Sequence, residues 1–452
     1  MDLINLDELI NIGLKVVEKA KEIGADELEI FLSSSDVFSM RVITNYVTTR
    51  RGLDAGVGIR AVVGKRVGFA SASSISEEII LETAKNAVKI AKTRPEDPDF
   101  KHLPDPKKPS AKRGIYDEEL VTKSSDELIK IASDSIKRGF DKSSAVKKID
   151  YNLTKQVGVF AVVNSRGVEI GDSYTTIFSW ASVKAERNGE TVTAYEIFSS
   201  RRFEEEPLLT VSEKAAERAL RMFGGKKLEK AFTGQAVIEN FVVSDFLWPL
   251  TYNVNARNVQ EKRSGFANKL NTEVANEKVT ILDDGTLPEG LMTFTVDMEG
   301  IPMTKKTLIE KGVLKTFVYD SYTAFREGRE STGNAMRRSF ENLPAPSTTN
   351  IVMEAMANKG AQELIMEIDK GVYIGGFTMG SHLTDPLKGT FSVTSLNAFY
   401  VENGDIKYPL KSVTAGGNFY ELLRNILIVG SDYRLTSFGK IPSILVDKIS
   451  FV

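Results

Sequence analysis

Hydrophobic and polar positions along the first 92 residues follow two different periods. Apolar side chains recur at helical spacing over residues 6–20, and Gly24 stands where a glycine typically closes a helix. Residues 76–92 return to the helical period, with Ser76 as the expected N-cap. Apolar and polar residues alternate, as in strands, over residues 28–32, 37–43, 46–51, 56–63 and 66–71. This pattern predicts an α+β unit with helices lying on a sheet.

The next segment, residues 93–110, carries five prolines among charged residues. Proline blocks both the helix interior and the central strand, so we expect a solvated connection here. Beyond it the same two periods return. Helices are predicted over residues 124–138 and 212–223, and strands over residues 145–154, 156–164, 168–185 and 190–199.

Short strands and turns dominate the chain from residue 230 onward. Between residues 279 and 319 we expect four strands, over residues 279–282, 293–297, 306–309 and 313–319. Hairpins repeated in this way commonly curl into a barrel or a sandwich. The sequence therefore predicts an α+β N-terminal region with long helices on a sheet, followed by a β-rich barrel- or sandwich-like C-terminal domain. The predicted divisions are residues 1–110, 111–229 and 230–452.

The overall composition excludes few classes of protein. Hydrophobic residues at 42% and charged residues at 27% are ordinary for a soluble globular protein. A formal net charge of -2 gives no basic field to attract nucleic acid or an anionic membrane. The acidic residues near the N-terminus do not fit a signal peptide, and no apolar stretch reaches about 18 residues. We therefore expect no nucleic-acid partner and no association with a membrane. The expected location is cytoplasmic.

Histidine is scarce in this chain and cysteine is absent. The absence of cysteine removes disulfides, thiolate ligands and a cysteine nucleophile. A helical zinc peptidase site needs two histidines on one helix face and a glutamate. The only histidines are His102 and His382, which are too far apart to share a helix. His102 is expected to be exposed in the proline-rich connection, whereas His382 follows a glycine-rich turn and is a candidate for binding or for an interface.

Six short motifs then follow one another in a fixed order between residues 283 and 350. They are DDGT, DMEG-P, LIEKGVLK, DSYTA, STGNAMRRS and LPAPSTTN. In order and spacing they resemble the C-terminal domain of the TldD/PmbA family. That family pairs TldD, which resembles a zinc-type metallopeptidase, with TldE (PmbA), which lacks the metal site and completes the complex. The fragments RGLDAGVGIRAVVG and NSRGVEIGDSY give a looser resemblance over the N-terminal half.

The resemblance also locates the positions of the metal site. When SGFA at residues 264–267 and DDG at residues 283–285 are used as anchors, the TldD histidines and glutamate fall near Leu247, Trp248 and Tyr252. The position of the family's further cysteine ligand corresponds to Ser437 and Phe438. The resemblance therefore implies a TldE-like subunit with no metal or catalytic residue of its own. Zinc is expected only in a TldD-like partner.

The motif STGNAMRRS offers residues for binding a peptide. Gly333 and Asn334 can adopt backbone angles closed to most residues, and Arg337 and Arg338 carry forked donors suited to a carboxylate or to backbone carbonyls. The alternative is a tight turn whose arginines pair with acidic neighbours such as Glu327 or Glu330. Both interpretations are kept open.

Other motifs give weaker candidates. The glycine pairs at residues 375–376 and 416–417 lack the order of a phosphate-binding loop and are expected at bends. The acidic pairs Asp283-Asp284 and Asp297-Glu299 are expected at hairpin turns rather than in a two-carboxylate glycosidase site. No Gly-x-Ser-x-Gly motif of a serine hydrolase is present.

Three functional hypotheses result from these observations. The first is a non-catalytic partner of a TldD-like zinc peptidase that acts on unfolded or extended peptides. The second is a homodimeric peptide-binding or scaffold protein without protease activity. The third is a hydrolase whose site the motifs do not reveal. Purification of the chain with a TldD-like protein would separate the first from the second.

Overall fold

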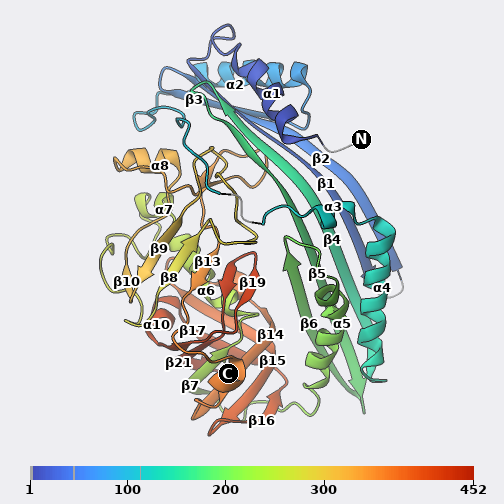
Figure 1. Cartoon of the computed structure of the whole chain (residues 1–452). Coiled ribbons are helices and arrows are strands. Elements are labelled where there is room, and N and C mark those ends of the chain that lie inside the picture. The colour runs from blue at the N-terminus through green and yellow to red at the C-terminus, as the bar shows by residue number, and fades with distance from the viewer. Residues whose placement is uncertain (1–3, 44–45, 112–113) are drawn as a thin grey trace.

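A long, curved, antiparallel sheet forms the N-terminal half of the molecule (Figure 1). The structure is a computed structural model that describes residues 4–43, 46–111 and 114–452. The sheet has the strand order β3-β2-β1-β4-β5-β6. Its strands are β1 (Glu27–Ile43), β2 (Tyr46–Val63), β3 (Arg66–Ala72), β4 (Val146–Asn164), β5 (Glu169–Arg187) and β6 (Glu190–Ser200). Strands β1 and β4, which lie on either side of the proline-rich connection, pair directly.

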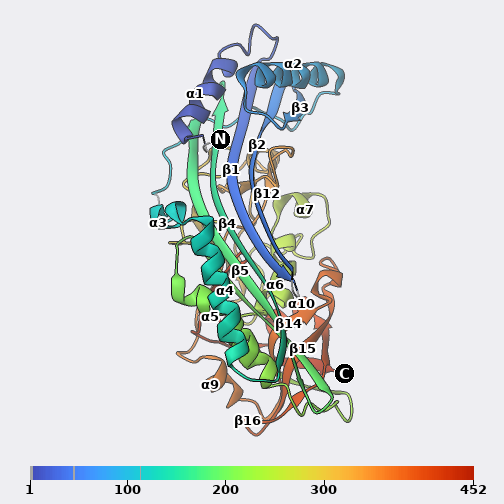
Figure 2. The same ribbon diagram turned by 90° about the vertical axis from the view of Figure 1, so that its right-hand side faces the viewer.

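Two pairs of helices cover one face of this sheet, one pair at each end (Figure 2). At one end lie α1 (Leu6–Val17) and α2 (Glu77–Thr93), and at the other α4 (Ser125–Asp141) and α5 (Glu205–Leu220). A short helix, α3 (Glu118–Thr122), precedes α4. Capping boxes at Asn5 and Ser124 fix the starts of α1 and α4, whereas Ser76 occupies the N-cap position of α2 without a side-chain hydrogen bond. Each helix pair encloses its own hydrophobic core against the sheet.

Several predicted strand ends are wrong in this half. The separate strands expected over residues 28–32 and 37–43 form the single strand β1, and those over residues 145–154 and 156–164 form β4. Both strands are hydrogen-bonded on each side, and this pairing carries the backbone through polar positions that the pattern marked as breaks. Helix α5 begins at Glu205, seven residues before the predicted start.

The sequence predicted a solvated connection over the proline-rich segment, but part of this segment is buried. Phe100 and Leu103 are buried and pack with Val62 of the sheet. His102, expected to be exposed, is half-buried, and its ring lies 4.9 Å from that of Phe325. The apolar residues between the prolines therefore pack this segment against the long sheet.

A closed five-stranded barrel forms the core of the C-terminal half. Its strands pair in the circular order β14-β7-β21-β17-β15, and the pairing of β14 with β15 closes the ring. They are β7 (Phe232–Ile238), β14 (Lys370–Met379), β15 (Thr390–Glu402), β17 (Val413–Asn418) and β21 (Ile444–Phe451). Strands β16 (Asp405–Leu410) and β18 (Ile426–Val429) pair with β15 and β21. Helix α10 (Phe419–Arg424) packs beside them.

The C-terminal half contains a second sheet. Its order is β10-β9-β8-β13-β20-β19, formed by β10 (Val313–Leu314), β9 (Lys305–Glu310), β8 (Ile281–Asp284), β13 (Ile351–Met353), β20 (Gly439–Ile441) and β19 (Arg434–Thr436). The strand predicted over residues 293–297 is absent except for a bridge at Val296, and that over residues 313–319 is reduced to β10. Phe294, Val296 and Phe340 instead pack on the face of the long sheet that the helices leave open. Tertiary packing thus replaces the expected hairpin.

The remaining elements are short. They are α6 (Val243–Asn253), α7 (Ala256–Gln260), α8 (Ser321–Arg326), α9 (Ala361–Ile365), the 3₁₀ turn η1 (Ser381–Leu383), β11 (Ala335–Met336) and β12 (Ala345–Pro346). The predicted fold class, α+β with a β-rich barrel-like C-terminal domain, is confirmed. The predicted divisions at residues 110 and 229 remain predictions. No helix in the described part of the chain has the length and apolarity needed to cross a membrane.

Candidate functional site at helix α6

Helix α6 carries the positions at which the family resemblance places a metal site. It packs its apolar face into the core of the barrel half, through residues that include Val243, Phe246, Leu247 and Leu250. Pro249 lies inside this helix, which continues through it to Asn253. The Asn253 side chain donates a hydrogen bond to the Pro249 carbonyl (2.8 Å), which satisfies an acceptor near the helix end.

Leu247, Trp248 and Tyr252 cannot bind zinc as the two histidines and the glutamate of the family motif do. Leu247 is fully buried and offers no ligand atom. The indole nitrogen of Trp248 can only donate, and its N–H bonds the Ser381 carbonyl at 2.9 Å. Tyr252 is half-buried and supplies a phenol in place of an imidazole or a carboxylate. The donor set of a helical zinc site is therefore missing at these positions.

A cavity of about 240 Å³ lies between the start of α6 and residues 434–438, and Leu247, Trp248 and Tyr252 are not among the residues that line it. Ser244 and Asp245 of α6 line one side of it, and residues 434–438, including Ser437 and Phe438, line another. Phe178, Ile197, Phe241 and Phe377 complete a mostly apolar wall. Across the described residues, no group of three or more histidine, cysteine, aspartate or glutamate side chains is placed to hold a metal ion.

Asp245 is the single carboxylate in this cavity. Thr378 donates a hydrogen bond to it, and the Ser381 hydroxyl lies 3.5 Å from its Oδ1. Burial raises the pKa of Asp245, because the charged form loses water that these two hydroxyls replace only in part. One carboxylate can accept hydrogen bonds from a ligand, but it does not provide the second group that general acid–base hydrolysis requires.

His382 lies on the surface next to this helix. It belongs to η1, which follows Gly380 in the left-handed conformation (φ 87°), and its side chain is exposed. The hydrogen bond from Trp248 to the Ser381 carbonyl fixes the neighbouring backbone. The structure thus places His382 in a position accessible to a partner or a ligand, and its predicted binding or interface role stays a prediction.

The motif STGNAMRRS divides between the interior and the surface. Asn334 is fully buried and donates to Asp283 and to the Ser347 carbonyl, both at 2.8 Å. Arg337 is buried and donates to Glu29 at 2.5 Å, so neither Glu327 nor Glu330 is its partner. Gly333 is also buried, whereas Arg338 is exposed. In this conformation only Arg338 of the motif presents a charged side chain to a peptide, and the peptide-binding role of the group remains a prediction.

A buried cluster of charges surrounds Arg337, and the sequence patterns did not reveal it. Arg60 donates to Glu29 (2.7 Å) and to Glu299 (2.8 Å), and all these side chains are nearly or completely closed to solvent. Asp297 lies at the expected turn, where the Gly300 N–H donates to its carbonyl at 3.0 Å. It is also fully buried, and its carboxylate accepts hydrogen bonds from three backbone N–H groups. The available signal was Glu29 and Arg60 at inward positions of otherwise apolar strands.

These contacts shift two acids of the cluster in opposite directions. Burial, together with the charge of Glu299, raises the pKa of Asp297 to about 8. Burial also acts to raise the pKa of Glu299. The Arg60 guanidinium and the hydrogen bonds from Ser321 outweigh it and hold the pKa of Glu299 below its usual value. The cluster joins the long sheet to the C-terminal half.

Comparison with known proteins gives one consistent result. The chain matches three domains described as the PmbA/TldA metallopeptidase domain 1 (residues 28–91), central domain (residues 118–223) and C-terminal domain (residues 233–452). It is 30% identical over 429 residues to an uncharacterised protein of Methanocaldococcus jannaschii, covering 94% of each chain. It is 28% identical to a protein named metalloprotease TldD homolog in Buchnera aphidicola, covering 84% of this chain and 80% of that one.

The fold has a solved counterpart. The structure of TldE from Thermococcus kodakarensis superimposes with a TM-score of 0.88 at 23% identity, covering 98% of this chain and 100% of that chain. At this identity the superposition shows the shared fold. The three matched domains confirm the family indicated by the sequence motifs. The chain belongs to the PmbA/TldD metallopeptidase family.

Proposed function

We propose that this chain is a TldE/PmbA-like, non-catalytic subunit of a TldD-type zinc metalloprotease complex that degrades or processes unfolded peptides. The observation that carries the proposal is the chemistry of α6, where Leu247, Trp248 and Tyr252 stand at the positions of the family's ligands and base. The fold of a peptidase is kept, but the side chains that would bind and activate a water molecule are replaced.

Burial supports this assignment. Leu247 is fully buried in the hydrophobic core of the barrel half, and Trp248 holds the backbone of η1 through its indole nitrogen. Both side chains thus stabilise the protein at positions where a catalytic subunit would hold a metal. A buried imidazole in place of Leu247 would need a partner that this core does not provide.

The proposal assigns zinc and catalysis to a TldD-like partner in the cytoplasm. Exclusion of folded proteins requires only walls and a narrow entrance, which a non-catalytic subunit can supply. Extended peptides can be held by pairing with a sheet edge, a mode that uses backbone groups more than particular side chains.

The test is to express this chain with and without a TldD-like protein from the same organism. We expect the two proteins to purify as one species by light scattering, with zinc in the complex and none at stoichiometric level in this chain alone. Cleavage of an unstructured peptide should require the complex and disappear on chelation. The TldD-like protein alone is the control for activity that is independent of this chain.

Three results would contradict the proposal. One tightly bound zinc per isolated chain would show a metal site that the α6 chemistry does not predict. Self-association of this chain with no affinity for the TldD-like protein would favour the homodimeric scaffold. Peptide cleavage by this chain alone that survives chelation would favour a hydrolase with a different site.

A further inference from the structure

The helix-covered face of the long sheet is apolar at its two ends and polar in the middle. On β1, residues 28, 30 and 32 belong to the core under α1 and α2, and residues 38, 40 and 42 to the core under α4. The residues of the same face between them are Ser34 and Asp36. On β4, Lys155 interrupts the same apolar row between Leu153 and Val157. Polar residues that interrupt an apolar row, where the fold does not require them, are expected at functional sites.

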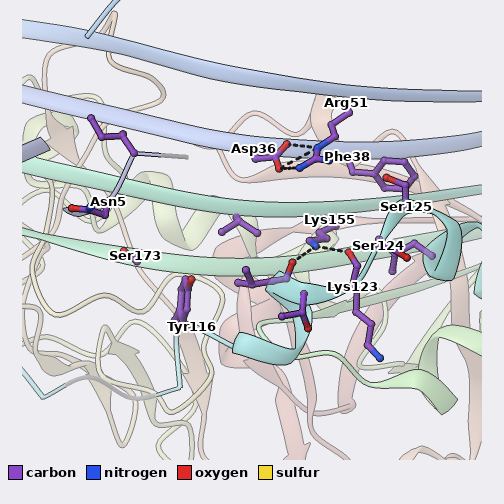
Figure 3. A pocket seen from close by; sticks show the side chains of 15 residues that line it. Asn5, Asp36, Phe38, Arg51, Tyr116, Lys123, Ser124, Ser125, Lys155 and Ser173 are labelled. Carbon is purple, nitrogen blue, oxygen red and sulfur yellow. Dashed lines mark hydrogen bonds and ion pairs between the residues drawn. The ribbon is translucent and has the colours of Figure 1, made fainter. Parts of the chain in front are cut away.

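A cavity of about 470 Å³ lies over this polar middle (Figure 3). Its floor is formed by the sheet, and its walls by the start of α1 and by the junction of α3 and α4, so it occupies the gap between the two helix pairs (Figure 2). The volume falls within the range of cavities that bind small molecules. It lies on the face of the sheet opposite to the C-terminal half, and so is separate from the α6 site.

Lys155 is the most buried charged group of this cavity, with a relative exposure of 9%. Its ammonium nitrogen donates to the carbonyl oxygens of Val121 and Lys123, each at 2.7 Å (Figure 3). An ammonium has three N–H bonds, and no other described residue accepts the third at hydrogen-bond distance. One donor of a buried cation is thus left for an acceptor in the cavity.

A second cation stands beside it on the floor. Arg51 on β2 and Lys155 on β4 are both paired in register with Phe38, on the strand between them. Asp36 accepts hydrogen bonds from the Arg51 Nε (3.1 Å) and Nη2 (2.7 Å), and no other described residue accepts from the remaining guanidinium donors. Two cations against one carboxylate give the floor a net positive charge.

The rest of the lining suits a ligand with an apolar body. Ile4, Val121, Leu128 and Val157 contribute aliphatic surface, and Tyr116, Ser125 and Ser173 contribute hydroxyl groups. The N-caps of α1 and α4 also line the cavity, but capping boxes already engage the backbone N–H groups there. The charge of a ligand must therefore be met by the two side-chain cations.

We propose that this cavity binds a small organic anion, whose carboxylate or phosphate accepts hydrogen bonds from Lys155 and Arg51 and whose apolar part lies against Phe38 and Val157. The site is independent of the proposed peptidase role. The site lies between the two helix pairs, and a bound anion would contact β2 and β4 and lie beside the α3–α4 junction.

The test uses the full chain and three probes of similar size, benzoate, phenyl phosphate and the uncharged benzamide, in titration calorimetry. We expect saturable binding of one or both anions and none of benzamide. Benzoate alone would identify a carboxylate ligand, and phenyl phosphate alone a phosphate ligand. Arg51→Gln and Lys155→Met should each lower the affinity for the anion by about tenfold or more, because each removes a charge-assisted hydrogen bond.

The controls separate binding from folding. Arg51 has a largely exposed side chain, so Arg51→Gln should keep the melting temperature even if Lys155→Met loosens the α3–α4 junction. Lys148→Met removes a cation on the opposite face of β4, where Lys148 pairs with Asp150, and should leave anion binding unchanged. The proposal is overturned if neither anion binds, if benzamide binds equally well, or if a folded Arg51→Gln variant keeps full affinity.

Discussion

Glu29 on β1 and Arg337, 308 residues further along the chain, form an ion pair that is completely closed to solvent. The Arg337 Nη2 lies 2.5 Å from the Glu29 Oε1, and the same guanidinium donates to the carbonyls of Met298 and Asn342. Glu29 also accepts from Arg60, which in turn bonds Glu299. This cluster connects the first strand of the long sheet to the C-terminal half of the protein.

Removal of one member of this pair should be strongly destabilising. We expect Arg337→Met to lower the free energy of unfolding by about 3 to 5 kcal/mol, because Glu29 would keep a buried charge with one cation fewer. The urea midpoint measures the loss. Arg338→Met, one residue along and exposed, is the matched control and should change stability by less than about 0.5 kcal/mol.

The same pair of variants tests the alternative role of Arg337 in holding a peptide. If Arg337→Met kept its urea midpoint but weakened peptide binding by the assembled complex, the buried pair would contribute nothing to the fold. Arg337 would then be a binding residue, as the motif first suggested. Equal destabilisation by Arg337→Met and Arg338→Met would also contradict the structural explanation.

The fold class could be predicted because it depends on local periodicity. The helix start at Ser124 carries its own capping box in the sequence, and strands β5 and β6 alternate clearly around the turn at Asn188-Gly189. Barrel closure by β14 and β15 could be predicted only as one of two outcomes, since a barrel and a sandwich share the same hairpin pattern.

The interior charges could not be predicted in the same way. Asp297 and Glu299 do lie at a turn, as expected. Their side-chain partners, however, are backbone N–H groups and an arginine 239 positions away, which no local pattern indicates. The strand expected at residues 293–297 does not form, because Phe294 packs on the long sheet, a distant contact that the local pattern does not indicate. The assignment of the metal-site positions to α6 depends instead on the order of motifs along the chain, and it remains a prediction.

Gly333 should tolerate no side chain. Its φ of 69° is unfavourable for other residues, and a Cβ would lie 2.2 Å from the Pro302 carbonyl oxygen, which belongs to the backbone and cannot turn away. We expect Gly333→Ala to cost more than about 2 kcal/mol of unfolding free energy. Gly328→Ala is the control, since Gly328 has a similar φ of 64° with open space around it, and should cost about 1 kcal/mol. Equal losses would show that the contact with Pro302 is unimportant.

Trp248 should control the mobility of the turn that carries His382. Trp248→Phe removes the hydrogen bond from the indole nitrogen to the Ser381 carbonyl but keeps an aromatic ring at this position. We expect faster hydrogen exchange at residues 381–384 and a global stability loss of only about 1 kcal/mol. The matched control is Trp180→Phe, which changes the other tryptophan on β5 and should leave exchange at residues 381–384 unchanged. Unchanged exchange in Trp248→Phe would mean that the turn is held by other contacts.

Asp320 should make stability depend on pH. Its Oδ1 accepts hydrogen bonds from the Thr323 N–H and hydroxyl at the start of α8, and its Oδ2 lies 3.5 Å from Arg257. Burial and the charge of Glu299 nevertheless raise the pKa of Asp320 from the ordinary 3.8 to about 6. The folded protein therefore binds more protons than the unfolded chain between these two values. The contribution of Asp320 to stability is complete below about pH 4 and is lost as the pH rises to about 6.

Asp320→Asn isolates this contribution, because an asparagine can still cap α8 through its Oδ1 but cannot ionise. Relative to the wild type, the variant should gain up to about 3 kcal/mol of unfolding free energy between pH 4 and pH 7, following the shift of about two pKa units. The measurement is the urea midpoint of both proteins across this range. Asp297 remains in both, so a further decline toward pH 8 should be common to the two curves. Parallel curves from pH 4 to pH 7 would show that Asp320 is ionised in the folded protein throughout, and that Arg257 outweighs burial and Glu299 at this position.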